Sequence, residues 1–478
     1  MGRDVLLLYM SPKNPNYKTQ TNEGAVRYLI KEKETPDCIL ALCSETVRKK
    51  AVVEMPDGRT CTTLEYFRDA LRRVGIPAER LVVIEVPDSM DDEKKQFQAI
   101  SQLLDKIEKE DTLSIDLSGG MRDTAMLLVT AARCMRDLRG VQTRRVIYAE
   151  LRGEEPVAHD RTQLYDLFDF VTAMDEFFST GTAQKLKSYL WSEGEKDPVL
   201  HTLLTRINQF SEDLALCRVR KLNDDLNQIA QALKEMPKKS QNLTDLFFRL
   251  LKDRFSTEFA ELLTSGEKAL PALVSWCAKH GMYQQALTLL CEQMPAYVCR
   301  HLFVQPTETG WAYLAAQNQN KGKAWVYPLF HFHFCRLTLM QKEYPYTTDL
   351  RLTHSKDDAE GNMLFGVANS KEMHAYMDTV LASGQLVIDP DVRWQIEDAA
   401  LFYQRVMQYR NQINHASDTA FGLQSDRILP LDTAHIEQTL QDVADYLQEI
   451  RPMKPDVPKG VKALPVTKTI PAGAAPNL

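Results

Sequence analysis

The sequence predicts an amino-terminal α/β domain, a Rossmann-like parallel-rich sheet with helices on both faces, followed by a mainly α-helical half. Three observations predict this fold class. Short apolar runs of strand length alternate with amphipathic helices as far as Leu151. From Leu164 to Ile450, helix-forming residues recur with amphipathic spacing. The last residues, 451–478, hold six prolines and an excess of positive charge, a composition that does not bury a core.

The strands of the first domain are expected where runs are apolar throughout, which is typical of strands buried on both faces of a parallel sheet. These runs are Asp4–Met10, Cys38–Cys43, Leu81–Val86, Leu113–Leu117 and Arg145–Leu151. The helices expected between them are one that begins near Asn22, and Thr62–Val74, Asp91–Ile107 and Met121–Leu138. Sheets of this kind bind ligands at the carboxyl ends of their strands.

A turn with ligand-binding character lies where the fourth strand gives way to a helix. Residues Asp116 to Arg122 read DLSGGMR. Gly119 and Gly120 allow close approach of the backbone to a ligand, Ser118 can cap the helix, and exposed helix amides favour phosphate or ribose oxygens. A tight turn without a ligand explains the same residues. The chain has no GxGxxG after its first strand and no GxxxxGK[ST], which disfavours NAD enzymes and P-loop NTPases.

The residues that follow the predicted parallel strands are expected to share one ligand site, because the carboxyl ends of such strands meet at one edge of the sheet. The candidate ligand-binding residues are Ser11, Asn16, Thr21, Asn22, Ser44, Ser118, Gly119, Gly120 and Arg122.

The stretch from Val392 to His415 predicts a long amphipathic helix. Its apolar residues step by three and four, so one face packs inward and the end of that face brings Arg410 to a half-buried position. On a helix, Asn411 and His415 lie one turn apart on the same side, with Arg410 beside them. A solvated helix end explains these residues equally well. A second Arg-to-His pattern, Arg152 to His159, contains a proline and cannot lie on one continuous helix.

Composition narrows the class of protein. A chain of 478 residues holds two or three domains, and a net charge of −7 argues against nonspecific coating of DNA. The nine cysteines are scattered without CxxC spacing, and the start does not read as a secretory signal, so we expect reduced thiols and a cytoplasmic location. No apolar run approaches the length of a membrane-spanning helix, so we expect no membrane association.

One segment has the donor spacing of a metal site. His331 to Cys335 reads HFHFC, which places possible ligands alternately, as on a strand face. Aromatic residues intervene, and no further ligand pair lies nearby at finger-like spacing. A half-buried segment is the simpler explanation, and we expect no metal site.

The predicted sheet, the polar loop after its first strand and the Asp-x-Ser-Gly-Gly-x-Arg turn together resemble the CARF (CRISPR-associated Rossmann fold) sensor domain. The likeness covers about Met1 to Arg152, and more loosely Tyr165 to Phe178, which is similar to the segment that joins sensor to effector. Arg410 to His415 resembles the Arg, four-to-six residues, His signature of HEPN ribonucleases, including the asparagine after the arginine. A CARF-like start followed by a HEPN-like run near the end resembles the arrangement in the auxiliary ribonucleases of type III CRISPR systems.

The resemblance implies a division of the chain into four parts. These are a CARF ligand-sensing domain over 1–158, a helical linker over 159–195, a HEPN ribonuclease domain over 196–450 and a flexible tail over 451–478.

The resemblance also implies a function in antiviral defence. A homodimer would bind cyclic oligoadenylate, made by a type III CRISPR effector complex, as an allosteric activator, and would need no other cofactor. It would cleave single-stranded RNA without metal, leaving 2′,3′-cyclic phosphate and 5′-hydroxyl ends. Arg410 suits the phosphate oxygens, His415 suits proton transfer near neutral pH, and Asn411 could orient either. Two alternatives stay open, a ligand-sensing regulator without catalysis and a ring nuclease that degrades its own activator. Rings of three, four and six adenylates also stay open.

Overall fold

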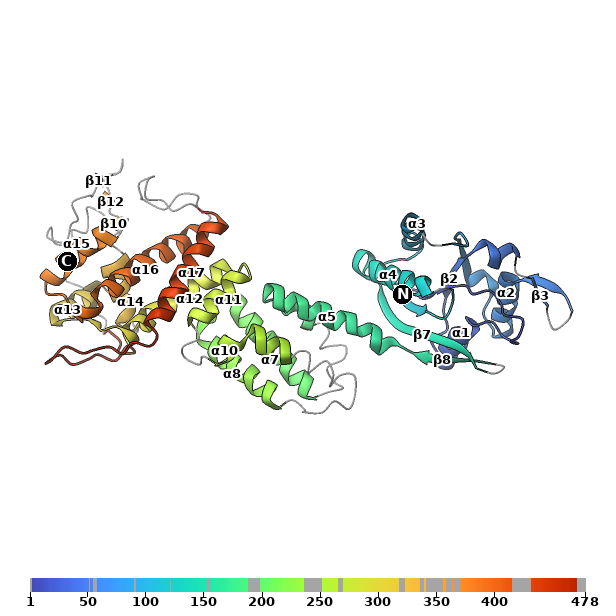
Figure 1. Ribbon diagram of the computed structural model, residues 1–478, viewed down its shortest axis with the longest axis horizontal. Coiled ribbons are helices and arrows are strands. Elements are labelled where there is room, and N and C mark those ends of the chain that lie inside the picture. The colour runs from blue at the N-terminus through green and yellow to red at the C-terminus, as the bar shows by residue number, and fades with distance from the viewer. Residues whose placement is uncertain are drawn as a thin grey trace. The chain divides into compact units, whose positions relative to one another are not determined.

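The computed structural model describes most of the chain, in two units. The described residues are 2–50, 52–54, 58–89, 92–120, 122–152, 155–187, 198–235, 252–264, 270–317, 323–335, 339–340, 356–357, 363–364, 370–414 and 431–470. Contacts within the chain divide it into Met1–Val171 and Thr172–Leu478, here called unit 1 and unit 2. Figure 1 shows the elements of both units.

Unit 1 is built on a six-stranded sheet in the order β5-β2-β1-β6-β7-β8. The strands are β1 (Asp4–Tyr9), β2 (Cys38–Cys43), β5 (Leu81–Glu85), β6 (Thr112–Asp116), β7 (Gln142–Arg152) and β8 (Glu155–Asp160). The first five pair in parallel, as the sequence predicts. The chain adds strands to one side of β1 and then to the other, so the strand order reverses between β1 and β6.

The last predicted strand, which corresponds to β7, does not form the edge of the sheet. Strand β8 pairs with it in the antiparallel direction and forms the edge instead. The sequence analysis did not predict β8. Its residues, EPVAHD, include a proline and charged ends, which edge strands tolerate and which give no apolar run. A small antiparallel hairpin, β3 (Val52–Glu54) with β4 (Thr60–Thr62), was also not predicted.

Helices cover both faces of the sheet, which confirms the predicted fold class. The helices and helical turns of this unit are α1 (Glu23–Lys31), η1 (Thr46–Lys50), α2 (Thr63–Arg73), η2 (Ala78–Arg80), α3 (Glu93–Leu104) and α4 (Arg122–Arg139). Side chains of β1 alternate between two cores. Leu7 packs in the core that holds residues of α3 and α4, and Leu6 packs in the core that holds residues of α1 and α2.

Unit 2 is mainly helical, as predicted. Helix α5 (Thr162–Thr180) crosses the boundary between the units, within the stretch expected to join the two domains. The other helices and helical turns described are α7 (Pro198–Ala215), α8 (Val219–Glu235), α10 (Ala260–Thr264), α11 (Leu270–Lys279), α12 (Tyr283–His301), α13 (Glu308–Gln317), α14 (Val326–Leu329), η5 (Phe330–Cys335), α15 (Ser370–Ala382), η8 (Pro390–Val392), α16 (Arg393–Asn414) and α17 (Thr433–Ile450).

Short strands complete unit 2. They are β9 (Val304–Pro306) paired with β13 (Leu386–Ile388), and β10 (Leu339–Met340), β11 (Lys356–Asp357) and β12 (Met363–Leu364). Helices α12, α15 and α17 and the helical turn η5 all pack against α16. Ile396, Ala399 and Val406 of α16 are fully buried, in the three-and-four spacing that predicted this helix.

The end of the chain corrects the prediction of a flexible tail. Residues 451–470 lie against unit 2, where the indole Nε1 of Trp325 donates to the carbonyl of Pro465 at 2.9 Å and Ile470 is buried. Proline has no backbone N–H to donate, but its carbonyl still accepts hydrogen bonds, so a proline-rich segment can be held by donors elsewhere in the chain. Residues 471–478 lie outside the described part of the chain.

Candidate functional site

The carboxyl ends of β1, β2 and β6 meet at one edge of the sheet, because these strands are parallel neighbours. The register pairs Leu8 of β1 with Asp116 of β6. Ser11, Ser44 and Ser118 therefore follow three adjacent strands at the same edge, as the predicted topology requires. This edge includes the point where the strand order reverses, which is where open α/β sheets bind ligands.

Asp116 organises the turn after β6 from a fully buried position. Its Oδ1 accepts hydrogen bonds from the backbone nitrogen of Ser118, at 2.9 Å, and from the Ser118 hydroxyl. Its Oδ2 accepts from Asn22 Nδ2 at 2.7 Å. Burial raises the pKa of Asp116 to about 6, although the hydrogen bonds from Ser118 and Asn22 oppose the shift. The carboxyl group thus ties the turn after β6 to the start of α1.

The loop after β1 is closed by Gln20 and Asn22. Asn22 Oδ1 accepts from the backbone nitrogen of Ser11 at 3.0 Å and from Gln20 Nε2 at 2.5 Å. Gln20 Nε2 also donates to the Ser11 carbonyl at 2.8 Å. The Ser11 hydroxyl in turn accepts from the Gly120 nitrogen at 3.2 Å, so the loops after β1 and β6 are joined directly. The sequence analysis missed Gln20, whose only signal was its place in the polar loop.

Gly119 and Gly120 are required by the protein's own packing. A Cβ atom at Gly119 would overlap the carbonyl oxygen of Tyr9 and lie 2.8 Å from its carbon. A Cβ at Gly120, where φ is +83°, would overlap the hydroxyl of Thr124 and lie 2.8 Å from a ring carbon of Tyr9. The turn passes so close over the end of β1 that packing alone accounts for both glycines. Approach to a ligand is therefore not the reason for glycine here, and a ligand role for this turn stays a prediction.

The remaining predicted ligand residues differ in their surroundings. Asn16 is exposed in the first loop, and Thr21 is half-buried just before Asn22. The hydroxyl of Ser44 is buried and accepts from the Val47 nitrogen at 3.5 Å, so it supports η1. Arg122 is the first residue of α4, and its side chain lies outside the described part of the structure.

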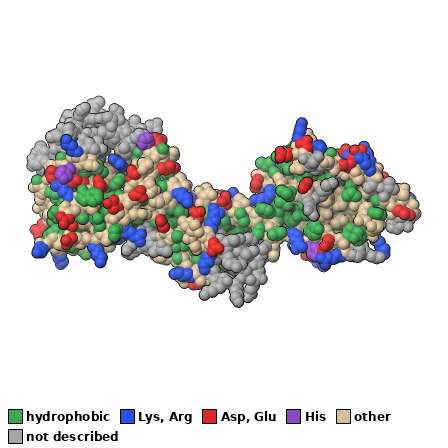
Figure 2. Space-filling model, viewed as in Figure 1, with side chains coloured by type: hydrophobic (Ala, Val, Ile, Leu, Met, Phe, Trp, Pro, Cys, Tyr) green, Lys and Arg blue, Asp and Glu red, His purple; other side chains and the backbone are tan. Residues whose placement is uncertain are grey.

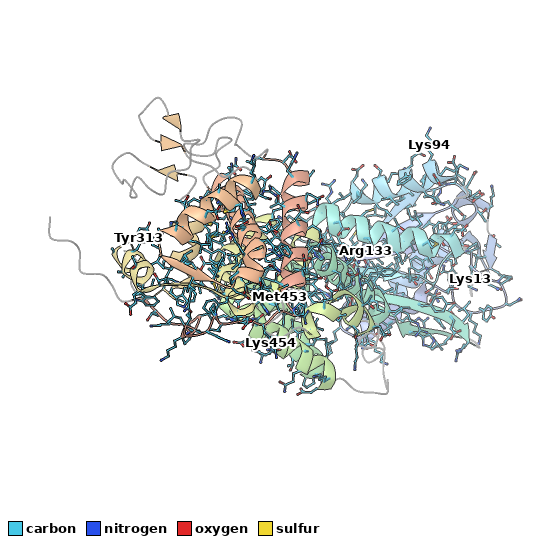
Figure 3. The ribbon with its side chains drawn as sticks, turned by 60° about the vertical axis from the view of Figure 1, so that its left-hand side comes forward. Lys13, Lys94, Arg133, Tyr313, Met453 and Lys454 are labelled. Atoms are coloured by element: carbon cyan, nitrogen blue, oxygen red, sulfur yellow. The ribbon has the colours of Figure 1, made fainter. Side chains whose placement is uncertain are left out.

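Lys13, labelled in Figure 3, is a basic residue of the first loop, and its side chain contacts other residues of unit 1. Its Nζ donates to the Asn14 carbonyl at 3.0 Å and lies 5.4 Å from the centre of the Tyr66 ring. Its backbone nitrogen donates to the Thr63 hydroxyl at 3.2 Å. Burial lowers the pKa of Lys13, and the nearby Glu23 carboxylate opposes this. These contacts fix the first loop on the start of α2.

Helix α16 brings Arg410 and Asn411 together at its carboxyl end. Both side chains are half-buried, and Arg410 Nη1 donates to Asn411 Oδ1 at 3.3 Å. Arg410 Nε is buried and has no hydrogen-bond partner among the described residues. His415 follows the last described residue of the helix, Asn414, and lies outside the described part of the chain. Its pairing with Arg410 stays a prediction.

Two other helices begin at this end of α16, and we call their meeting place the helical end. The amide of Gln284, at the start of α12, donates to Asn414 Oδ1 at 3.2 Å. The hydroxyl of Tyr283 donates to Glu437 of α17. These two hydrogen bonds join the start of α12 to the end of α16 and to the start of α17.

Neither a metal site nor a membrane helix is found in the described part of the chain. No group of three or more His, Cys, Asp or Glu side chains that could hold a metal occurs there. The segment His331 to Cys335 belongs to η5, a π-helical turn and not a strand, with Phe330 and Phe334 buried and their ring centres 4.8 Å apart. Among the helices described, none is long and apolar enough to cross a membrane.

Surface charge is mixed in both units. Lys and Arg side chains are interspersed with Asp and Glu on the visible faces (Figure 2), in keeping with the net charge of −7. Nonspecific binding of nucleic acid through a broad basic surface is therefore not what these faces favour.

Comparison with known proteins gives one kind of match. No family model matches the sequence, and no curated protein matches it. Among solved structures, the chain is similar to Enterococcus italicus Csm6 bound to cyclic hexa-2′-fluoro-hexa-dAMP, with 11% identity and a TM-score of 0.26 over 95% of each chain. At that TM-score and identity the match carries no functional assignment, which depends on the chain's own residues.

Proposed function

We propose that the protein is a homodimeric endoribonuclease of CRISPR antiviral defence that cyclic oligoadenylate activates. The observation that carries the proposal is the junction of the loops after β1 and β6, where Ser11, Asn22 and Gly120 are joined at the strand-order reversal. The same chain ends a long helix with Arg410 and Asn411 in contact and His415 next in sequence. A nucleotide-sensing edge and a metal-free RNA-cleaving end are the functions that these two places suit best.

At the sheet edge, the ligand would be an anion with ribose hydroxyls. The Ser11 hydroxyl accepts from Gly120 and keeps its own proton for a phosphate or ribose oxygen. Arg122, at the start of α4, would add a positive charge beside the first amides of that helix. Because the buried Asp116 carboxyl lies next to this edge, an anionic ligand would favour its protonated form.

At the helical end, the chemistry would need no metal. The 2′-hydroxyl of RNA supplies the nucleophile, so the protein has only to align it, move protons and stabilise charge on the phosphorus oxygens. Arg410 is half-buried with its Nε free of partners among the described residues, which suits a guanidinium that binds phosphate oxygens. His415 would transfer a proton near neutral pH.

Calorimetric titration with cyclic tri-, tetra- and hexa-adenylate tests the sensing half. One ring size should bind, and Arg122→Ala should weaken that binding at least tenfold, because a guanidinium contributes through charge-assisted hydrogen bonds to phosphate. Arg139→Ala, at the exposed other end of α4, is the matched control and should bind like wild type. Binding of none of the three rings would contradict the sensing function, and consumption of the ring during titration would favour a ring nuclease.

The catalytic half is tested by His415→Ala. This variant should bind the activator like wild type and cleave single-stranded RNA at least 100-fold more slowly, since positioned proton transfer contributes about 10²–10⁴-fold. A wild-type rate in this variant would contradict the assignment of the ribonuclease site.

A further inference from the structure

The proline-rich end of the chain is held on unit 2 in the way that proteins hold extended peptides. The indole Nε1 of Trp325 donates to the Pro465 carbonyl, and the Trp325 backbone nitrogen donates to the Lys468 carbonyl at 3.0 Å. Ala324 and Thr469 form an antiparallel bridge. Aromatic contact with a proline segment and main-chain pairing with an extended one are both recurring modes of peptide binding.

A buried side chain of unit 2 binds the backbone of the same stretch. Gln305 of β9 is 6% exposed. Its Nε2 donates to the Lys462 carbonyl at 3.0 Å, and its Oε1 accepts from the Leu464 nitrogen at 2.9 Å. Both polar groups of this buried amide are therefore satisfied by a peptide, and loss of the peptide would leave them costly to bury.

Two side chains of the stretch restrict which peptide fits. Ile470 is buried, and Lys468 Nζ lies 4.5 Å from the centre of the Trp311 ring, a cation–π contact. The fitting peptide is therefore extended and has a proline, a cation three residues later and an apolar anchor two residues after that. We call residues 462–470 the terminal segment, and Gln305, Trp311, Ala324 and Trp325 the peptide site.

The terminal segment is joined to α17 by a tether, residues 454–461. At the start of the tether, the Met453 carbonyl accepts a hydrogen bond from His301 Nδ1 at 3.1 Å. Among the described residues, the hydrogen bond found within the tether is internal, from the Val461 nitrogen to the Pro458 carbonyl. Eight extended residues span about 26 Å, so the terminal segment can leave its site while α17 stays in place.

Charge also favours delivery of the terminal segment to another molecule. The last 28 residues carry a net charge of +4, whereas the whole chain carries −7, so the first 450 residues carry −11. The rest of a second copy therefore attracts this basic end as the rest of its own copy does.

We infer that the peptide site binds the terminal segment of a second copy of this chain, so that two copies exchange these segments. This inference deepens the proposed homodimer and rests on it. Every contact broken within one copy is made again by the same residues between copies, so the exchange has a small net free energy. In a dimer held by other contacts, the tether keeps the exchanged segment at high effective concentration beside the peptide site.

Cysteines at the bridged pair test the exchange in the full chain. One variant carries Ala324→Cys and another carries Thr469→Cys, so neither variant alone can form a disulfide between these two positions. Cβ atoms of residues opposed on antiparallel strands lie about 4.5–5.5 Å apart, which a small shift brings within disulfide range. After mild oxidation, an equal mixture of the two variants should give a covalent dimer on a non-reducing gel. Each variant alone should not.

A matched control tests whether the cysteines meet by random collision. Thr433→Cys places a cysteine at another exposed threonine, outside the terminal segment. Mixed with Ala324→Cys, it should give no covalent dimer. Equal yields from Thr433→Cys and Thr469→Cys would overturn the inference.

The double variant, with Ala324→Cys and Thr469→Cys in one chain, shows where the terminal segment lies. If it closes a disulfide within single chains while the mixture gives no covalent dimer, the segment stays in its own copy and the exchange is overturned. If it forms no disulfide either within or between chains, the peptide site itself is wrong.

The buried anchor gives a second measurement. Adding Ile470→Asp to the Thr469→Cys chain should lower the yield of covalent dimer at least about fivefold, because a carboxylate is disfavoured in the buried place of Ile470. Adding Lys459→Ala, in the exposed tether, should leave the yield unchanged. A yield unaffected by Ile470→Asp would contradict binding at the peptide site.

The assay uses neither RNA nor cyclic oligoadenylate, so the exchange and the proposed function can fail separately. Light scattering gives the oligomeric state of the wild type. A dimer whose mixed variants do not cross-link leaves the proposed homodimer standing and overturns only the exchange. A monomer at every concentration overturns both the exchange and the proposed homodimer.

Discussion

Replacement of Gly119 by alanine tests the close passage of the turn over β1. The added Cβ would overlap the Tyr9 carbonyl oxygen and lie 2.9 Å from Asn22 Nδ2. Both neighbours belong to the network at the sheet edge, because Asn22 Nδ2 donates to that carbonyl at 3.1 Å. Rotation of a flexible side chain therefore cannot make room for the added methyl group, so the backbone of the turn or of β1 must move.

The expected cost follows from two effects. Overpacking of a close-packed site costs about 1–3 kcal/mol, and the strained hydrogen bond between Asn22 and Tyr9 adds about 1 kcal/mol. A total of about 2–4 kcal/mol should lower the melting temperature of unit 1 by about 4–16 °C, at about 2–4 °C per kcal/mol for a domain of this size.

Differential scanning calorimetry of the full chain measures this shift. Gly140→Ala is the control, since φ there is +72° and the nearest atom to the added Cβ is Lys109 Cγ at 3.9 Å. It should cost only the backbone strain of about 1–2 kcal/mol. If Gly119→Ala melts at or above the control, the close passage is refuted. Loss of activator binding in a Gly119 variant would report a distorted edge, which is why Arg122 is the better probe of ligand contact.

Four further outcomes are expected. Because the Asp116 pKa rises from 3.8 to about 6 on folding, the folded state holds an extra proton between these values, so unit 1 should lose stability from about pH 4 to pH 6 relative to Asp116→Asn, as differential scanning calorimetry checks. Arg410→Lys should lower kcat/KM for RNA at least tenfold while Arg405→Lys does not, because lysine cannot bind phosphate in bidentate fashion. Cleavage assayed in excess chelator should proceed at the rate without it. Trp325→Phe removes the donor to Pro465 and should speed limited proteolysis within 451–470.

The strands could be predicted because parallel strands buried on both faces are apolar throughout, and this holds for β1, β2 and β6. The edge strand β8 could not, since it has one exposed side and no such pattern. The prediction of a flexible tail over the proline-rich end was wrong for a related reason. Composition shows that a segment forms no core of its own, but not that a donor such as Trp325 holds it.

At the sheet edge, sequence reasoning predicted which loops lie together but not the contacts that join them. Strand order placed Ser11, Asn22 and Ser118 at one edge. The bond from Asn22 to Asp116 joins residues 94 positions apart, so no local pattern reveals it. For Gly119, the turn was evident in the sequence, whereas its contact with Tyr9 depends on tertiary packing.

The central claim is that ligand at the sheet edge switches on a metal-free ribonuclease at the helical end. The most direct measurement is cleavage of end-labelled single-stranded RNA by wild type and His415→Ala, with chelator, with and without the cyclic oligoadenylate that binds. Wild type should cleave only with the ring present and leave 2′,3′-cyclic phosphate ends, and the variant should remain inactive in both conditions. Equal cleavage with and without every ring, or ring-dependent cleavage by His415→Ala at the wild-type rate, would contradict the claim.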